Sequence, residues 1–593
     1  MNHFCKSLIA PVFLILLPPL GGIAQEIRQT DKSEAGEINR RIALVSDRIM
    51  FGNTPEMTPD FILADISLKP EFKRRFTEFS GDISGRYFNA FSSTPFDGNP
   101  VDIHRLMAEA LTYQHKDGRF GNPGLVFDKE KLGGPQMALL WGNGRLLVGI
   151  MDYYKAYRKP EVLAAAKKLG DFLNGITDNC VSPEIAERFK DKSATGYICF
   201  TQLMEGLVML WDETKEDKYL RTASRVYTLL PPKGKQHSHG YLNTLLGTLM
   251  LYDRTGIPGH LNFVKSRYDE LVHSPDYLIT GGVPEYFGSV GVSKESRDEG
   301  CSESDFLMLS FHLWKTTQDM KYLENAEHCL INHLFANQFK TGDFGSKYLD
   351  PEIGFRVDKN SARCWWCCNF HALRALNETR QYIFTKKDKR IQFNLFFDGE
   401  YQDNGVHLKA VQAENHSNRF QITILNSAQD TRLAIRKPLW INGMSLKSNG
   451  KIVSTKVEGD YMVVDRALQP NEKLDLDLEY KLRLFDKDKK EIGLPLQAKT
   501  RAAIFYGPYL MSVDANFQPF FDSEPNYTNC LELPTLLNFT PASAPTDSKV
   551  RDCYLKADHV HSDMFGKYPV ILRPVGETAR ESPCNVRVWF DIR

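Results

Sequence analysis

The sequence predicts a multidomain protein in which an all-α, (α/α)6-barrel-like domain is followed by antiparallel β-sandwich domains. Two observations support this fold class. From about residue 44 to 385 the apolar residues recur every three or four positions, which is typical of amphipathic helices. From about residue 390 apolar and polar residues alternate, which is typical of half-buried strands.

Composition excludes several classes of protein. The chain has 593 residues with 74 basic and 74 acidic side chains, so its formal net charge is zero. This balance argues against a nucleic-acid-binding protein, because such proteins attract their partner with an excess of positive charge. Apolar residues make up 42% and charged residues 25%, which excludes a largely disordered chain.

Residues 1–24 are predicted to be a secretory signal peptide. Lys6 is followed by a short apolar run and then by small residues, and we place the cleavage site after Ala24. Prolines interrupt the run, which is short for a membrane span. We therefore expect a periplasmic or secreted protein without stable membrane insertion. The alternative is an uncleaved membrane anchor.

A helical module repeats along the first part of the chain. Each copy is an apolar helix that ends near an aromatic residue, then a polar turn, then a second helix. The copies occupy residues 144–166, 200–223, 241–264 and 304–326, with a partial fifth copy at 367–384. The equivalent aromatic residues are Tyr154, Trp211, Tyr252 and Trp314. Their uneven spacing argues against a regular solenoid and favours helical hairpins that close into a ring. An open helical array is the alternative.

Long loops separate these hairpins and contain the chemically unusual residues. They span residues 176–199, 227–240, 276–303 and 339–368. If the hairpins form a ring, these loops meet at one rim, where binding sites commonly lie. The β-rich remainder is expected to form two sandwiches, 386–485 and 486–593, joined near the charged segment 485–493, that brace the helical domain of residues 25–385.

Four residues could form a metal site. Glu299, Cys301, Cys367 and Cys368 supply three thiols and a carboxylate, which is a complete tetrahedral ligand set for zinc. Each pair begins a predicted helix after a long loop, and a helix N-terminus favours the thiolate form. From the residues alone, a disulfide or a buried structural zinc site remains an alternative to a catalytic site.

Glu285 is a candidate general acid. It lies in the glycine-rich loop 277–301 beside Tyr286 and Phe287. A carboxyl group held against aromatic surface has a raised pKa and can donate a proton near neutral pH. The alternative is an ordinary solvated loop residue.

These segments resemble glycoside hydrolase family 127, which is best known for β-L-arabinofuranosidase activity. The family's E-T-C segment is similar to Glu299-Gly300-Cys301, and its C-C-P-P-N segment is similar to Cys367-Cys368-Asn369-Phe370. Its Gly-Gly loop before a Glu-aromatic pair resembles Gly281-Gly282 and Glu285-Tyr286. Further similar segments run from the first repeat through the β-rich part to the C-terminus, so the resemblance covers most of the mature chain.

The resemblance implies a function and a role for each residue. It implies that residues 25–385 form the catalytic domain of a retaining exo-glycosidase that removes terminal sugars from oligosaccharide or polysaccharide side chains. It also implies that Zn2+ binds to Glu299, Cys301, Cys367 and Cys368. Cys367 would be the nucleophile and Glu285 the acid and base.

The chain also departs from the family pattern. Asn369 and Phe370 replace two prolines, and Gly300 replaces threonine. Gln202 occupies the position where we expect a sugar-binding histidine, and Leu245-Leu246 occupy the position of a family Gly-His pair. These changes affect sugar recognition more than the metal and nucleophile positions.

Two other functions remain open from the sequence. One is a non-catalytic sugar-binding or scaffold protein with structural zinc. The other is a polysaccharide lyase on a similar architecture, in which His237, His239 or a loop tyrosine would act as the base. The sequence leaves the sugar, its linkage and the oligomeric state open.

Overall fold

A computed structural model describes residues 36–592, apart from short segments within that range. The segments outside the description are 1–35, 52–57, 73–77, 93–100, 293–295, 352–353, 358–364, 404, 414–416, 429, 515–528, 532–539, 543–553, 563–565, 579, 581–583 and 593. The signal peptide expected at 1–24 lies outside the described residues and stays a prediction. Among the helices that the structure describes, none is both long enough and apolar enough to cross a membrane.

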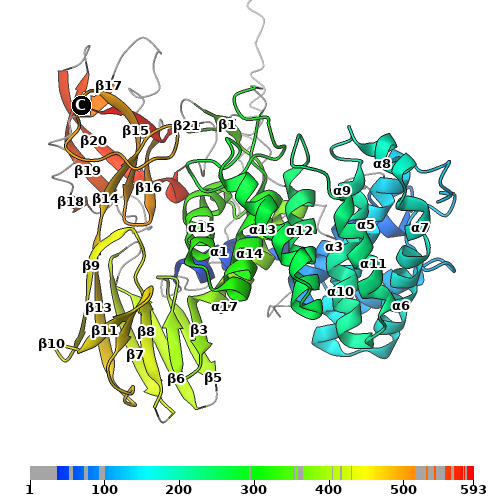
Figure 1. The fold of residues 1–593 in the computed structure, drawn as a ribbon, viewed down its shortest axis with the longest axis horizontal. Helices are drawn as coiled ribbons and strands as arrows, with labels where there is room; N and C mark the ends of the chain where they lie inside the picture. Colours follow the sequence, from blue (N-terminus) through cyan, green and yellow to red (C-terminus); the bar gives the residue numbers. More distant parts are fainter. Residues whose placement is uncertain are drawn as a thin grey trace, which may run out of the picture. The chain divides into compact units, whose positions relative to one another are not determined.

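Helices of the first part of the chain form a closed ring through their mutual contacts. Figure 1 labels these helices. In ring order these helices are α3 (Asp82–Ser92), α5 (Gly134–Tyr157), α10 (Leu203–Thr214), α12 (Ser238–Thr255), α14 (Gly300–Thr317) and α17 (Trp366–Ile383). Each packs against the next, and α17 packs against α3. The inward-facing helices are buried over most of their length, which explains why their apolar pattern is not confined to one stripe.

A second layer of helices packs outside the ring. These helices are α1 (Glu37–Phe51), α4 (Ile103–Thr112), α6 (Pro160–Gly175), α11 (Lys218–Val226), α13 (Pro258–Val272) and α15 (Met320–Cys329), each of which packs on at least one ring helix. Shorter elements are α2 (Pro59–Ser67), α7 (Thr177–Cys180), α8 (Pro183–Phe189), α9 (Tyr197–Phe200), η2 (Tyr227–Leu229), the π-helix η3 (Leu330–Leu334) and α16 (Phe335–Asn337). The arrangement confirms the predicted (α/α)6-barrel-like class and excludes an open array.

The repeated aromatic residue lies near the C-terminal end of four ring helices. After α5, α10, α12 and α14 the chain turns through a residue with left-handed backbone, whose N–H donates to a carbonyl four residues earlier. Those carbonyls belong to Tyr154, Trp211, Tyr252 and Trp314. This cap satisfies a carbonyl that the helix leaves open and reverses the chain into the outer helix. The sequence repeat is therefore one structural unit, the inner–outer hairpin.

Two sheets follow the helices. Their strands are β3 (Phe384–Lys387), β4 (Arg390–Phe393), β5 (Gly399–Asp403), β6 (Val406–Gln412), β7 (Arg419–Asn426), β8 (Arg432–Arg436), β9 (Ile441–Ser448), β10 (Lys451–Ile452), β11 (Thr455–Glu458), β12 (Tyr461–Val464) and β13 (Lys473–Tyr480). One sheet has the order β10-β9-β13-β7-β6-β5 and the other β11-β12-β8-β4-β3. All pairs are antiparallel except β4 with β8. Leu408 and Ile422 of one sheet and Ile435 of the other are buried, as expected for a β-sandwich.

The C-terminal strands form one large sheet with a contribution from the helical region. Its strands are β1 (Tyr348–Asp350), β2 (Gly354–Val357), β14 (Leu482–Phe485), β15 (Thr500–Tyr506), β16 (Tyr509–Asp514), β17 (Asn529–Leu531), β18 (Thr540–Ala542), β19 (Tyr554–Ser562), β20 (Gly566–Pro574), β21 (Cys584–Arg587) and β22 (Trp589–Ile592). The 3-10 helix η5 (Val575–Glu577) follows β20.

The second sandwich expected over 486–593 stays a prediction, but strand pairing crosses its expected bounds. The described strands there belong to a single sheet, and β2, from the loop 339–368, pairs with β21. Likewise β14, placed in the preceding domain by sequence, pairs with β15. Strand pairing is made by backbone groups, so local composition does not reveal which edge a short strand joins.

Buried polar contacts connect the helices to both β regions. Glu327 of α15 accepts hydrogen bonds from the guanidinium of Arg436 in β8 and, at 2.8 Å, from Nε1 of Trp440. Asn332 of η3 accepts from Leu510 N at 2.7 Å and donates to Pro508 O at 2.9 Å. The main apolar core likewise extends from the barrel helices into the sheets.

Glu327→Ala should destabilise the whole protein. The Arg436 side chain is fully buried, and removing its partner leaves an uncompensated charge. Breaking a buried ion pair in this way costs about 3–5 kcal/mol. Urea unfolding followed by tryptophan fluorescence measures the change. Asp430→Ala is the control, because its pair with Lys389 is mostly exposed and should contribute little. Equal midpoints for wild type and Glu327→Ala would contradict the role given to this contact.

Candidate active site

Two helix N-termini bring together the four residues predicted as metal ligands. Glu299 is the N-cap residue of α14 and Cys301 lies in its first turn, while Cys367 and Cys368 lie in the first turn of α17. All four are buried, and one donor atom from each lies within 4.8 Å of the others. Because α14 and α17 are neighbours in the ring, two segments distant in sequence form one cluster.

Gly300 permits the close approach of these two helices. A Cβ atom at this position would lie 3.1 Å from Cβ of Cys368 and 3.1 Å from Oδ1 of Asn337. Both distances are shorter than ordinary van der Waals contacts. The threonine of the family motif would therefore require α17 to shift in this chain.

The two other departures beside the cysteines serve packing. Oδ1 of Asn369 accepts a hydrogen bond from Phe344 N at 2.6 Å, which fastens the loop before β1 to α17. The Phe370 ring packs against Tyr87 and Phe91 of α3, with centroids 5.7 and 6.5 Å apart. Both residues thus hold the N-terminus of α17 in place on two sides.

The donor set fits a tetrahedral zinc ion. The sulfur atoms of Cys301 and Cys368 are 3.7 Å apart. Two Zn–S bonds of about 2.3 Å at a tetrahedral angle separate their sulfurs by about 3.8 Å. Burial, together with the neighbouring thiols, raises the pKa of Cys301 and Cys368 well above the ordinary value. The thiolates that bind metal are therefore stable here only with a cation among them.

Glu285 lies on a loop that is fixed beside the cluster. Ser238 N, at the start of α12, donates to Glu285 O at 2.9 Å, and Glu285 N donates to Arg297 O at 2.8 Å. The next residue, Tyr286, forms a backbone bridge with His237. These bonds hold the Glu285 backbone between α12 and the segment that leads into Glu299.

Opposing influences act on the Glu285 carboxyl group. Its residue is 7% exposed. Burial and the carboxylate of Glu299 raise its pKa above the ordinary value, against the opposite effect of its ion pair with Arg297. A raised pKa is what a general acid requires. Glu285 is thus a buried residue with a raised pKa, and its role as the general acid stays a prediction.

Arg297 is a site residue that the sequence analysis missed. Its guanidinium donates to both carboxylate oxygens of Glu285, with NH2 3.3 Å from Oε1, and lies 4.8 Å from the centre of the Trp365 ring. A signal was available in the sequence. Arg297 and Glu299 are two apart in an extended segment, so both side chains face the same side.

The histidines that could serve a lyase are engaged within the protein. Nε2 of His237 lies 3.2 Å from Oε2 of Glu299. His239 is 1% exposed, and its ring nitrogens contact Asp305 and, at 2.5 Å, the guanidinium of Arg86. A catalytic base needs a ring nitrogen directed at substrate, so His239 does not fill that role.

Positions expected to recognise sugar lie within the helix packing. Nε2 of Gln202 donates to Ile198 O and Gly240 O, both at 3.0 Å, and so ties α9 and α10 to α12. Leu245 and Leu246 are buried in the core of α12. Gln202 therefore does not replace a sugar-binding histidine.

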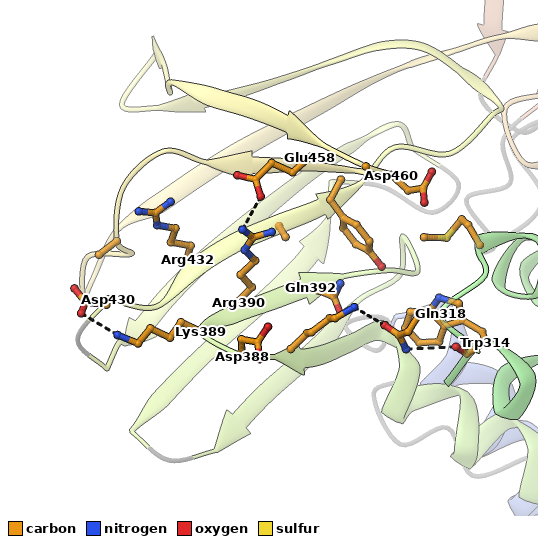
Figure 2. Close-up of a pocket in the computed structure, with 16 residues that line it drawn as sticks. Trp314, Gln318, Asp388, Lys389, Arg390, Gln392, Asp430, Arg432, Glu458 and Asp460 are labelled. Atoms are coloured by element: carbon orange, nitrogen blue, oxygen red, sulfur yellow. Dashed lines mark hydrogen bonds and ion pairs between the residues drawn. The ribbon is translucent and has the colours of Figure 1, made fainter. Parts of the chain in front are cut away.

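A separate pocket of about 750 Å3 lies on the first β region near the C-terminal end of α14 (Figure 2). Its charged side chains include the ion pairs Arg390–Glu458 and Lys389–Asp430. Trp314 and Gln318 contribute from α14. With a rise of 1.5 Å per residue, Trp314 lies roughly 20 Å along the helix from Cys301. This pocket is therefore distinct from the cysteine cluster.

Comparisons with known proteins agree with this architecture. The family model for the GH127 β-L-arabinofuranosidase catalytic domain matches residues 101–380, and the model for the GH127 middle domain matches residues 390–480. A comparison with curated protein sequences finds no match.

Two solved structures share the fold at low identity. One is a GH127 β-L-arabinofuranosidase from Geobacillus stearothermophilus T6, with a TM-score of 0.68, 14% identity, and coverage of 94% of this chain and 99% of that chain. The other is a GH127 β-arabinofuranosidase, with a TM-score of 0.70, 15% identity, and coverage of 94% and 95%. The catalytic and middle-domain models together span well over half of the sequence, in the order in which the barrel and the first β region occur. The chain is therefore a glycoside hydrolase and belongs to family 127.

Proposed function

We propose that this protein is a zinc-dependent, retaining exo-glycosidase that removes terminal β-L-arabinofuranose-like sugars from plant-type glycan side chains. The observation that carries the proposal is the buried Glu299, Cys301, Cys367 and Cys368 cluster, with donor atoms within 4.8 Å of one another. Glu285, the proposed acid and base, lies beside it and is coupled to Glu299 electrostatically. The sugar is suggested by the activity named for the family models and for the similar structures.

Cys367 is the proposed nucleophile among the three thiols. It is 5% exposed, whereas Cys301 and Cys368 are 0% exposed, so Cys367 is the most accessible of the three thiols. Zinc held by the four residues would keep Cys367 as a thiolate at neutral pH. Glu299, Cys301 and Cys368 would complete the ligand set.

The first step forms a covalent bond to the enzyme. The Cys367 thiolate attacks the anomeric carbon of the terminal sugar, and the bond from that carbon to the leaving oxygen breaks. Glu285 donates its proton to the leaving oxygen, which departs as an alcohol. Glu285 is left as a carboxylate, which the guanidinium of Arg297 stabilises through the ion pair seen between them.

The second step releases the sugar. The Glu285 carboxylate takes a proton from a water molecule as the water oxygen attacks the anomeric carbon. The carbon–sulfur bond breaks, Cys367 leaves as a thiolate, and Glu285 is again protonated. Two displacements at one carbon retain the configuration.

Protein purified without chelator should contain one zinc ion per chain. The three thiols and one carboxylate form a closed tetrahedral set, and elemental analysis measures the occupancy. Cys301→Ser should lower the zinc content, whereas Cys199→Ser should not, because Cys199 is buried elsewhere and its thiol faces Ala194 O. Metal-free protein with full activity would refute the metal role.

Wild type should hydrolyse p-nitrophenyl β-L-arabinofuranoside with retention, observed by NMR of the first-formed anomer. Glu285→Gln should lower kcat/KM for oligosaccharides by about 10²–10⁴-fold, the usual contribution of general acid–base catalysis. In Glu285→Gln, the rate at which the covalent intermediate forms should fall less with p-nitrophenyl glycosides than with oligosaccharides, because nitrophenolate leaves without taking up a proton.

The matched control is Glu184→Gln, which changes an exposed carboxylate of α8 that is not part of the cysteine cluster. Its activity should equal that of wild type. If Glu285→Gln loses the same factor with both kinds of leaving group, Glu285 is not the acid. If wild type inverts configuration, the mechanism itself is wrong.

Cys367→Ser should bind sugar but form no covalent intermediate. Serine keeps an oxygen at this position but loses the easily ionised sulfur. Intact-mass and peptide spectra after treatment with a cysteine-directed sugar inactivator should place the adduct on Cys367 in wild type. Cys368→Ser should instead lose metal affinity, and excess zinc should restore part of its activity by mass action. An adduct that persists in Cys367→Ser would show that another residue is the nucleophile.

A further inference from the structure

A group of buried polar side chains lies one helical turn deeper in the barrel than the cysteine cluster. It consists of Arg86 from α3, His239 from α12, Asp305 from α14 and His371 from α17. None is more than 2% exposed. Asp305 follows Cys301, and His371 follows Cys367, by four residues, so each lies on the same helix face as the ligand above it.

Hydrogen bonds join these side chains into a chain that ends at Arg86. Nε2 of His371 lies 2.6 Å from Oδ1 of Asp305, and Nδ1 of His239 contacts the other carboxylate oxygen. A carboxylate oxygen accepts, so Nδ1 of His239 carries the proton and donates to Asp305. The other ring nitrogen of neutral His239, Nε2, then has no proton and is an acceptor. It receives a hydrogen bond from the guanidinium of Arg86 at 2.5 Å.

The guanidinium of Arg86 is held so that one N–H faces a ligand sulfur. Its Nε donates to Oδ1 of Asp82 at 2.9 Å, and its NH2 group donates to His239. The remaining NH1 group lies 3.8 Å from Sγ of Cys301. The planar fork of arginine makes these three contacts at once, which the single ammonium group of lysine cannot do with the same geometry.

Charge favours a cation at this position. Three thiolates and a carboxylate carry twice the charge of the divalent ion that they would hold, so the occupied cluster keeps an excess of negative charge. In a buried site this excess is costly unless a positive group lies nearby. Arg86 supplies a permanent positive charge in contact with Cys301.

His239, Asp305 and His371 also place donor atoms within 4.8 Å of one another and could be taken for a second metal site. The position of Arg86 opposes this interpretation. Its positively charged guanidinium touches His239 directly, so a metal ion bound there would lie beside a like charge. The group is better explained as a support for Arg86.

We propose that Arg86 is a positioning residue for the metal site: supported by His239, Asp305 and His371, it orients and partly neutralises the Cys301 thiolate. The inference rests on the metal role proposed above for Cys301. Outer partners of metal ligands typically contribute about 10- to 100-fold to metal affinity. Arg86 is a positioning residue because its described hydrogen bonds go to Asp82, His239 and the proposed ligand Cys301, and none of them goes to the proposed nucleophile.

Zinc affinity of the full-length protein, measured by competition with a chromophoric chelator, tests the inference. Arg86→Met should weaken zinc binding by about 10- to 100-fold, and Arg86→Lys should recover part of the loss because it keeps the charge. In the cobalt-substituted protein, the sulfur-to-cobalt absorption band should shift in Arg86→Met. A purely structural role would not move this band in protein that remains folded.

Arg145→Met is the matched control. Arg145 is another buried arginine of the ring, paired with Glu205 at 3.2 Å and with Asn243 at 2.9 Å. It should lower stability without changing zinc affinity. If Arg86→Met fails to fold because Asp82 is left unpaired, Asp82→Asn/Arg86→Met removes both charges and is measured instead.

Each outcome is decisive. Equal zinc affinity in wild type and the Arg86 variants would overturn the inference, as would an equal loss in Arg145→Met. A second zinc ion per chain that disappears in His371→Ala would show that the histidine group is itself a metal site. If wild type binds no zinc, the proposed function fails at its metal, and Arg86 has no metal ligand to position.

Discussion

The approach of the N-termini of α14 and α17 is the constraint on which this structure depends. Ring closure makes the two helices neighbours, and Gly300 lets them come within contact of each other. Only this approach turns two short cysteine segments into one ligand set. It also buries three thiols and a carboxylate together, so the thiolate forms of these cysteines would need a cation among them. The barrel therefore creates the site that is proposed to hold zinc.

The barrel interior contains buried charged side chains that are paired with one another. Below the cluster, Glu205 of α10 lies between Arg145 and Arg374. Burial alone would raise the pKa of Glu205, but the two guanidinium groups outweigh it and hold the pKa well below its usual range. A buried charge is tolerated only when it is paired, so inner helices that carry such residues must keep their relative positions. The ion pairs thus preserve the geometry that the cysteines require.

The β regions contribute rigidity to the same arrangement. Glu327 and Asn332, on the helix pair that follows α14, are fixed to the two sheet regions. The loop between η3 and α17 supplies β1 and β2 to the C-terminal sheet. Backbone carbonyls of that loop also accept hydrogen bonds from both neighbours of Glu299. Asp298 N donates to Lys347 O, and Gly300 N donates to Gly345 O. Similar structures of 14–15% identity share this architecture, which indicates that the framework tolerates wide sequence change.

The sequence by itself determined the local structure and the ligand chemistry. Helical and strand periodicities and the hairpin repeat marked by Tyr154 and its equivalents are properties of neighbouring residues, and the two cysteine segments supply the ligand types. The tertiary structure alone decided which distant groups meet. It paired β2 with β21, joined Arg297 to Glu285, and placed Arg86 against Cys301. Periodicity is encoded locally, whereas contact partners depend on how the ring closes and which edges the strands join.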